Sequence, residues 1–127
     1  MKLLFAIALG GAIGALGRHF VARAVTHALG LGFPYGTLTV NVVGGFALGV
    51  VVALLALRFS LPPAWQAFLT VGLLGGFTTF SAFSLEVVLL IERGTLGLAG
   101  LYVAASVILS VAALFAGLSA VRFLALP

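Results

Sequence analysis

GLLGGFTTFSAFS, at residues 72–84, is a weak helical segment in the middle of a long apolar run. Two glycines, Gly75 and Gly76, are followed closely by two threonines, Thr78 and Thr79. Glycine has a low helix propensity, and threonine hydroxyls offer local hydrogen bonds that compete with the helical ladder. In lipid, an interrupted helix is tolerated only where it is buried in protein or lines water. The pattern predicts an interruption near residues 75–79; an unbroken helix whose glycines serve packing is the alternative.

The sequence around this segment is too apolar for a soluble protein. Of its 127 residues, 64% are hydrophobic and 6% are charged, whereas about a quarter are charged in a typical soluble domain. A helix needs roughly 20 apolar residues to cross the hydrocarbon core of a bilayer. The uncharged runs therefore predict an all-α membrane protein with four transmembrane helices, at about residues 4–26, 36–57, 66–92 and 97–122.

Composition also excludes several classes of protein. The chain has no cysteine, so disulfides and thiol catalysis are excluded. Its net charge of +4 is spread along the sequence without a Lys/Arg block, so nucleic acid is not an expected partner. We expect one transmembrane domain over residues 1–127 and no separate soluble domain.

The basic residues that flank the spans are almost evenly divided between the two sides of the membrane. With four spans, the N-terminus, the second connection and the C-terminus share one side, and the first and third connections share the other. The flanking Lys and Arg residues set orientation, and a near-zero bias predicts insertion in both orientations. The first side carries Lys2, Arg58 and Arg122, and the second carries Arg23 and Arg93, with Arg18 as a further candidate.

Glycine pairs four residues apart occur in three of the spans. They are Gly10–Gly14, Gly45–Gly49 and Gly72–Gly76. Such pairs let helix backbones approach closely and gain dispersion contacts. Four short helices hardly enclose a polar path alone, so we expect an oligomer, although packing within one chain explains the glycines equally well.

Two phenylalanines, Phe80 and Phe83, are three residues apart and share a helix face beside the predicted interruption. A phenyl ring has a positive edge, so edge-on rings favour a small anion weakly. Conduction needs such weak binding. Packing or lipid contact is the alternative role for both rings.

Polar residues of the second and fourth spans offer neutral donors. Thr37 and Asn41 are an i,i+4 pair on one face, suited either to replacing an anion's hydration or to an interhelical hydrogen bond. Tyr102, Ser106 and Ser110 form a stripe that either lines a wet path or bonds its own helix.

Glu86 is the only acidic residue inside a span. An intramembrane carboxylate is a functional candidate by default. The alternative is an ion pair with Arg18 that keeps the membrane charge neutral.

Three segments resemble the Fluc/CrcB family of fluoride channels, in the family's order: GGAIGALGRHF at 10–20, GTLTVNVVGGFALG at 36–49 and GLLGGFTTFSAFS at 72–84. The four-span pattern extends the resemblance over the whole chain, and the GGxTTFSxF portion is specific. Two residues depart from the family's pattern: His19 stands where Tyr is common, and Ala82 where Thr is common.

The resemblance implies a dual-topology, antiparallel homodimer in the lipid bilayer with two fluoride pores. It also implies a structural Na⁺, not transported, held by the backbone carbonyls of Gly75 and Thr78; broken transporter helices coordinate Na⁺ similarly. Phe80, Phe83 and Asn41 match the family's pore residues. The polar surroundings of the pore would be Ser81, Ser84, Thr37, Tyr102, Ser106, Ser110 and Glu86.

The expected function is passive export of fluoride through a bacterial plasma (inner) membrane by a multi-pass channel, not an enzyme. The alternative is a proton-coupled small multidrug exporter, but those need an acid in the first span, which has none. A non-conducting assembly subunit would not need a polar constellation on three helices. An enzyme is the weakest candidate, because two glutamates and two scattered histidines form no recognisable site.

Overall fold

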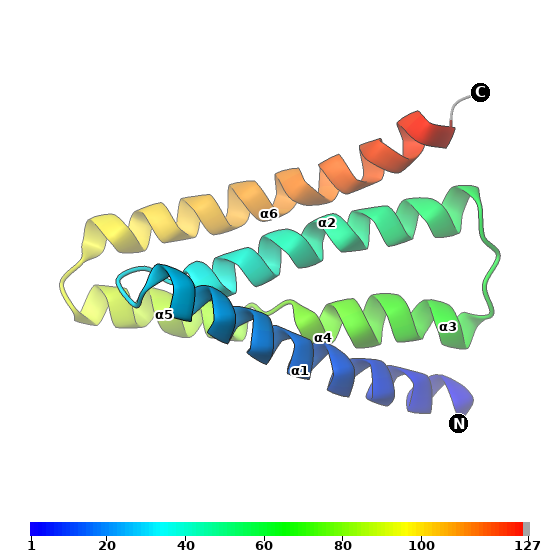
Figure 1. Ribbon diagram of the computed structural model, residues 1–127, viewed down its shortest axis with the longest axis horizontal. Helices are drawn as coiled ribbons and strands as arrows, with labels where there is room; N and C mark the ends of the chain where they lie inside the picture. Colours follow the sequence, from blue (N-terminus) through cyan, green and yellow to red (C-terminus); the bar gives the residue numbers. More distant parts are fainter. Residues whose placement is uncertain (126–127) are drawn as a thin grey trace.

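The computed structural model describes residues 1–125, and within this range the only regular secondary structure is helical (Figure 1). Four helical spans are long and apolar enough to cross a membrane, which confirms the predicted class and number of spans. Their ends lie up to three residues outside the predicted boundaries, because a helix continues wherever its backbone bonds can form. The spans are Lys2–Leu29, Tyr35–Leu57, Pro63–Glu92 and Leu96–Leu124.

The first two spans are single helices joined by a short connection. Helix α1 covers Lys2–Leu29 and ends at Gly30, whose φ of 89° lies in the left-handed region that favours glycine. The N–H of Gly30 donates to the carbonyl of Thr26 at 2.9 Å, which satisfies one of the last carbonyls of the helix. Helix α2 then covers Tyr35–Leu57.

The third span consists of four consecutive helical elements, and the fourth span is one helix. The second element of the third span is a π-helix, whose wider i→i+5 turns are rare and often occur near functional sites. The elements are α3 (Pro63–Ala67), η1 (Phe68–Leu74), α4 (Gly75–Phe77) and α5 (Ser81–Glu92), followed by α6 (Leu96–Ala125).

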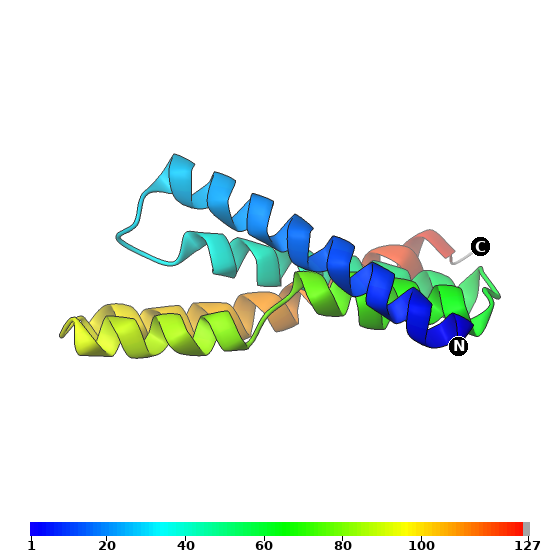
Figure 2. The ribbon, with the colours of Figure 1, turned by 90° about the horizontal axis from the view of Figure 1, so that it is seen from below.

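The spans run alternately up and down, so the N-terminus, the α2–α3 connection and the end of α6 lie together at one end (Figure 1). Helices α2 and α6 lie side by side along most of their length. Helix α1 crosses the first half of the third span and contacts α3, η1 and α4, as Figure 2 shows from another side. Helix α5 packs against α6 instead. Residues 78–80 therefore lie where the third span changes partners.

The glycine pairs make close helix contacts within the single chain. A Cβ at Gly14 would collide with the carbonyl of Leu73 in η1, and one at Gly49 would collide with the carbonyl of Leu114 in α6. A Cβ at Gly72 would approach the Cα of Gly10 to 3.0 Å. The predicted close contacts are confirmed, and they do not require a second subunit.

Candidate functional site

The backbone between α4 and α5 leaves the helical conformation at Thr78. This residue has φ −75° and ψ 159°, an extended conformation, whereas Phe80 is again near helical values at φ −93° and ψ −29°. The side chain of Thr78 remains tied to the preceding turn, because its Oγ1 donates to the carbonyl of Leu74 at 3.0 Å. Helix α5 begins at Ser81.

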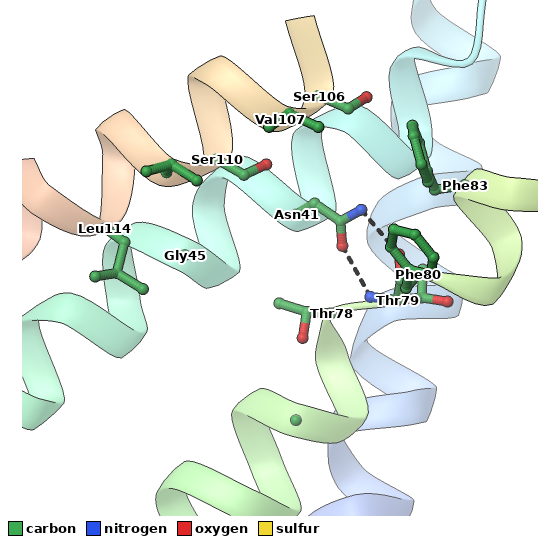
Figure 3. Close-up of a pocket in the computed structure, with 12 residues that line it drawn as sticks. Asn41, Gly45, Thr78, Thr79, Phe80, Phe83, Ser106, Val107, Ser110 and Leu114 are labelled. Carbon is green, nitrogen blue, oxygen red and sulfur yellow. Dashed lines mark hydrogen bonds between the residues drawn. The ribbon is translucent and has the colours of Figure 1, made fainter. Parts of the chain in front are cut away.

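Asn41, in the middle of α2, holds this segment with both ends of its amide (Figure 3). Its Oδ1 accepts from the N–H of Thr79 at 2.8 Å, and its Nδ2 donates to the carbonyl of the same residue at 2.9 Å. Two bonds from one planar group fix both the position and the orientation of the Thr79 peptide groups. One amide hydrogen of Asn41 remains for another partner.

Thr79 lies in the segment where the sequence predicted an interruption, and its side chain bonds the first turn of α5. Its Oγ1 accepts from the N–H of Ala82 at 3.2 Å and lies 3.2 Å from Oγ of Ser81. A threonine that bonds the N–H three residues later satisfies a donor that the helix start leaves free. Sequence reasoning did not select Thr79 as a site residue, although its place three residues before Ala82 is the spacing of such a cap.

Phe80 and Phe83 lie close together but in different surroundings. Their ring centroids are 5.3 Å apart, and the rings are tilted by 44°. Phe80 is 77% exposed in the single chain, whereas Phe83 is 8% exposed. Phe83 is also 5.3 Å from the ring of Tyr102 on α6.

The aromatic series continues past Tyr102 to the connection between α1 and α2. The ring of Phe33 stands edge-on to that of Tyr102, with centroids 5.4 Å apart and an interplanar angle of 83°. Sequence reasoning missed this residue, because nothing near Phe33 in the sequence indicates which helix its loop will contact.

Glu86 on α5 accepts hydrogen bonds from two neutral hydroxyls. Thr37 Oγ1 donates to one carboxylate oxygen at 2.7 Å, and the Tyr102 hydroxyl donates to the other at 2.6 Å. Arg18, the alternative partner considered for Glu86, lies on α1 along a cavity of about 860 Å³ that is also lined by Arg23. The structure therefore ties Glu86 to α2 and α6 through hydroxyl groups.

Two serines of α6 supply buried hydroxyls with no hydrogen-bond partner. The Oγ atoms of Ser106 and Ser110 are both buried and unpaired in the part of the chain that the structure describes. Both residues project from α6 on the side where Asn41 lies (Figure 3). Buried polar atoms are nearly always satisfied, so these two hydroxyls point to a partner that a single chain does not supply.

A groove of about 500 Å³ brings most of the predicted site residues together. It is formed by α2, α4, residues 78–80, the start of α5, and α6, and no residue along it is charged. The predicted site residues that line it are Asn41, Gly75, Thr78, Phe80, Phe83, Ser106 and Ser110.

The remaining predicted site residues lie outside the groove. Ser81 bonds the side chain of Thr79, and Ser84 donates to the carbonyl of Phe80 in its own helix at 2.9 Å. Thr37, Tyr102 and Glu86 form the hydroxyl–carboxylate cluster, which touches the groove through the Phe83–Tyr102 contact.

Comparison with known proteins gives a consistent set of relatives. The model of the family described as "CrcB-like protein, Camphor Resistance (CrcB)" matches residues 5–118. A protein of Rhodospirillum centenum named "Fluoride-specific ion channel FluC" is 52% identical over 122 residues, which cover 96% of this chain and 97% of that protein. Proteins of the same name from Caulobacter vibrioides and Rhizobium etli are each 50% identical, over 96% and 95% of this chain and 97% of each relative.

Proposed function

The chain belongs to the CrcB family, and from that premise we propose that it is a fluoride-specific channel that exports fluoride passively. Membership confirms the resemblance of the three sequence segments, and the relatives are named as ion channels, not as enzymes. The proposed activity is movement of fluoride down its electrochemical gradient, with no chemical step.

The observation that carries the proposal is the groove formed by α2, α4, α5 and α6, which has no charged residue and holds neutral donors among apolar side chains. Fluoride is small and strongly hydrated, so a pathway must offer many weak donors in place of water. The free hydroxyls of Ser106 and Ser110 and the second amide hydrogen of Asn41 are donors of this kind. A fixed positive charge would hold the anion too tightly for conduction.

The rings of Phe80 and Phe83 supply the apolar part of the same pathway. Their edges are weakly positive, and both residues line the groove with their rings tilted by 44° to each other. Edge contacts favour a small anion without binding it strongly. The membrane potential then drives export, at about 2.3 kcal/mol per elementary charge for each 100 mV.

A second copy of the chain closes the groove in this proposal. Phe80 is 77% exposed in the single chain, and the hydroxyl and amide groups of the groove would otherwise meet hydrocarbon, which satisfies no hydrogen bond. The near-even division of basic flanking residues supports an antiparallel, dual-topology homodimer with two pores, inserted in a bacterial plasma (inner) membrane.

A structural Na⁺ that is not transported belongs to the same proposal. Gly75 and Thr78 line the groove where the backbone leaves the helix, and their backbone carbonyl oxygens are hard ligands. Within the described residues no group of His, Cys, Asp or Glu side chains is placed to hold a metal ion, so main-chain oxygens are the fitting donors. Gly75 and Thr78 of two subunits would hold the ion, which would join the subunits.

Efflux from liposomes that contain the purified protein tests the function directly. Fluoride and chloride gradients of equal size are applied to separate samples, and the appearance of each anion outside is followed with an ion-selective electrode. Fluoride efflux that far exceeds chloride efflux and is absent from protein-free liposomes supports the proposal. Equal rates for both anions, or no efflux from folded protein, would refute it.

A further inference from the structure

We propose that Asn41 and Thr79 are positioning residues that keep the carbonyls of Gly75 and Thr78 free for a monovalent cation. This inference rests on the structural Na⁺ of the proposed function. Asn41 and Thr79 take up the two N–H groups that would otherwise bond these carbonyls.

A continuous helix would provide a hydrogen-bond donor for each of these two carbonyls. In an α-helix each N–H bonds the carbonyl four residues earlier. The N–H of Thr79 would therefore donate to the carbonyl of Gly75, and the N–H of Ala82 would donate to the carbonyl of Thr78. Either bond would occupy one of the proposed cation ligands.

Both donors are instead taken by side chains. The N–H of Thr79 donates to Oδ1 of Asn41 at 2.8 Å, and the N–H of Ala82 donates to Oγ1 of Thr79 at 3.2 Å. The carbonyls of Gly75 and Thr78 thereby lose their helical donors, and both residues line the same groove.

Two neighbouring carbonyls, those of Thr79 and Leu74, already have hydrogen-bond donors. Nδ2 of Asn41 donates to the carbonyl of Thr79 at 2.9 Å, so that oxygen already has a partner. The carbonyl of Leu74 is occupied as well, by the N–H and the hydroxyl of Thr78, both at 3.0 Å. The carbonyls of Leu74 and Thr79, which flank the segment from Gly75 to Thr78, are therefore already occupied.

The conformation of Thr78 completes the arrangement. Its ψ of 159° turns its carbonyl away from the axis along which helical carbonyls point. Thr79 is buried, at 8% exposed, and so its hydroxyl is held in one place by packing. Neither positioning residue has to touch the cation to control it.

The test measures how Na⁺ changes the thermal unfolding of the full-length protein in detergent. Na⁺ is titrated against N-methylglucamine at constant chloride, and the half-saturating Na⁺ concentration is read from the shift in Tm. Thr79→Val removes the hydroxyl and keeps the shape, whereas Thr79→Ser keeps the hydroxyl. Thr70→Val is the matched control, because the Thr70 hydroxyl bonds the carbonyl of Gln66 in its own span.

We expect Thr79→Val and Asn41→Leu to raise the half-saturating Na⁺ concentration about tenfold, because the returning helical hydrogen bond must break before the cation binds. Thr79→Ser and Thr70→Val should keep the wild-type value. If Thr79→Val fails to fold, Thr79→Ala removes the same hydroxyl with a smaller side chain.

Three outcomes would overturn the inference. Half-saturation within twofold of wild type in both Thr79→Val and Asn41→Leu would reject the positioning role and leave the Na⁺ site standing. A wild-type protein that conducts fluoride but shows no response to Na⁺ would reject the ion and the inference and leave the channel standing. Variants that fail to assemble in every salt, NaCl included, would show that the two residues serve folding alone.

Discussion

The hydroxyl of Tyr102 on α6 donates to a carboxylate oxygen of Glu86 on α5 at 2.6 Å. Tyr102 is fully buried, and its ring stands between those of Phe83 and Phe33. The bond therefore joins the hydroxyl–carboxylate cluster to the aromatic rings that line the groove. A substitution of Tyr102 or Glu86 is therefore expected to disturb both the hydroxyl–carboxylate cluster and the aromatic rings.

Tyr102→Phe should lower both stability and fluoride efflux. The variant keeps the ring but leaves one oxygen of Glu86 without its donor, at a cost of about 1–3 kcal/mol. Thermal unfolding measures the first effect, and liposome efflux measures the second. Tyr35→Phe is the matched control, because Tyr35 is 39% exposed. Unchanged stability in Tyr102→Phe would contradict the role of this bond.

Phe80→Ile and Phe83→Ile should reduce fluoride efflux by about tenfold or more, which corresponds to about 1.4 kcal/mol in the barrier. Isoleucine is apolar but has no positive edge, so the anion loses its weak contact. Phe5→Ile is the control, since Phe5 is 76% exposed, nearly the same as Phe80 at 77%, and lies on α1 away from the groove. Normal efflux from both folded variants would return the pair to a packing role.

Wild-type protein should insert in both orientations. The N-terminus, the α2–α3 connection and the end of α6 lie together (Figure 1), with Lys2, Arg58 and Arg122 on that side and a near-equal number of basic residues on the other. A short run of lysines added to the C-terminus should bias insertion and impair efflux, and an oppositely biased copy should restore it. Reporter fusions and efflux measure the two effects. Wild-type C-termini found on one side only would rule out dual topology.

Gly49→Ala should destabilise the contact between α2 and α6. The added methyl would meet the carbonyl of Leu114, and backbone must shift at a cost of about 1–3 kcal/mol. Gly100→Ala is the matched control, because a Cβ there has open space within the chain and alanine favours the helix. Thermal unfolding compares the two variants. Equal stabilities would mean that the contact between α2 and α6 accommodates the added methyl group at no cost in stability.

Much of the fold follows from the sequence because crossing a membrane is a local requirement. Each span must be apolar over its own length, so composition alone predicts the four helices and their approximate ends. The glycine pairs are also visible locally, since a residue without a side chain permits close contact with any neighbour. The sequence does not say which helix that neighbour belongs to.

Partners distant in the sequence were decided only by the tertiary structure. Asn41 could be recognised as a buried polar residue, but its bonds to Thr79 join positions 38 residues apart. The sequence left open whether Glu86 serves function or pairs with Arg18, and the fold gives it the hydroxyls of Thr37 and Tyr102. Hydrogen bonds require alignment within a few tenths of an ångström, and packing of α2 and α6 sets that alignment. Residue type thus determined the chemistry available at the groove, and helix packing decided which groups meet.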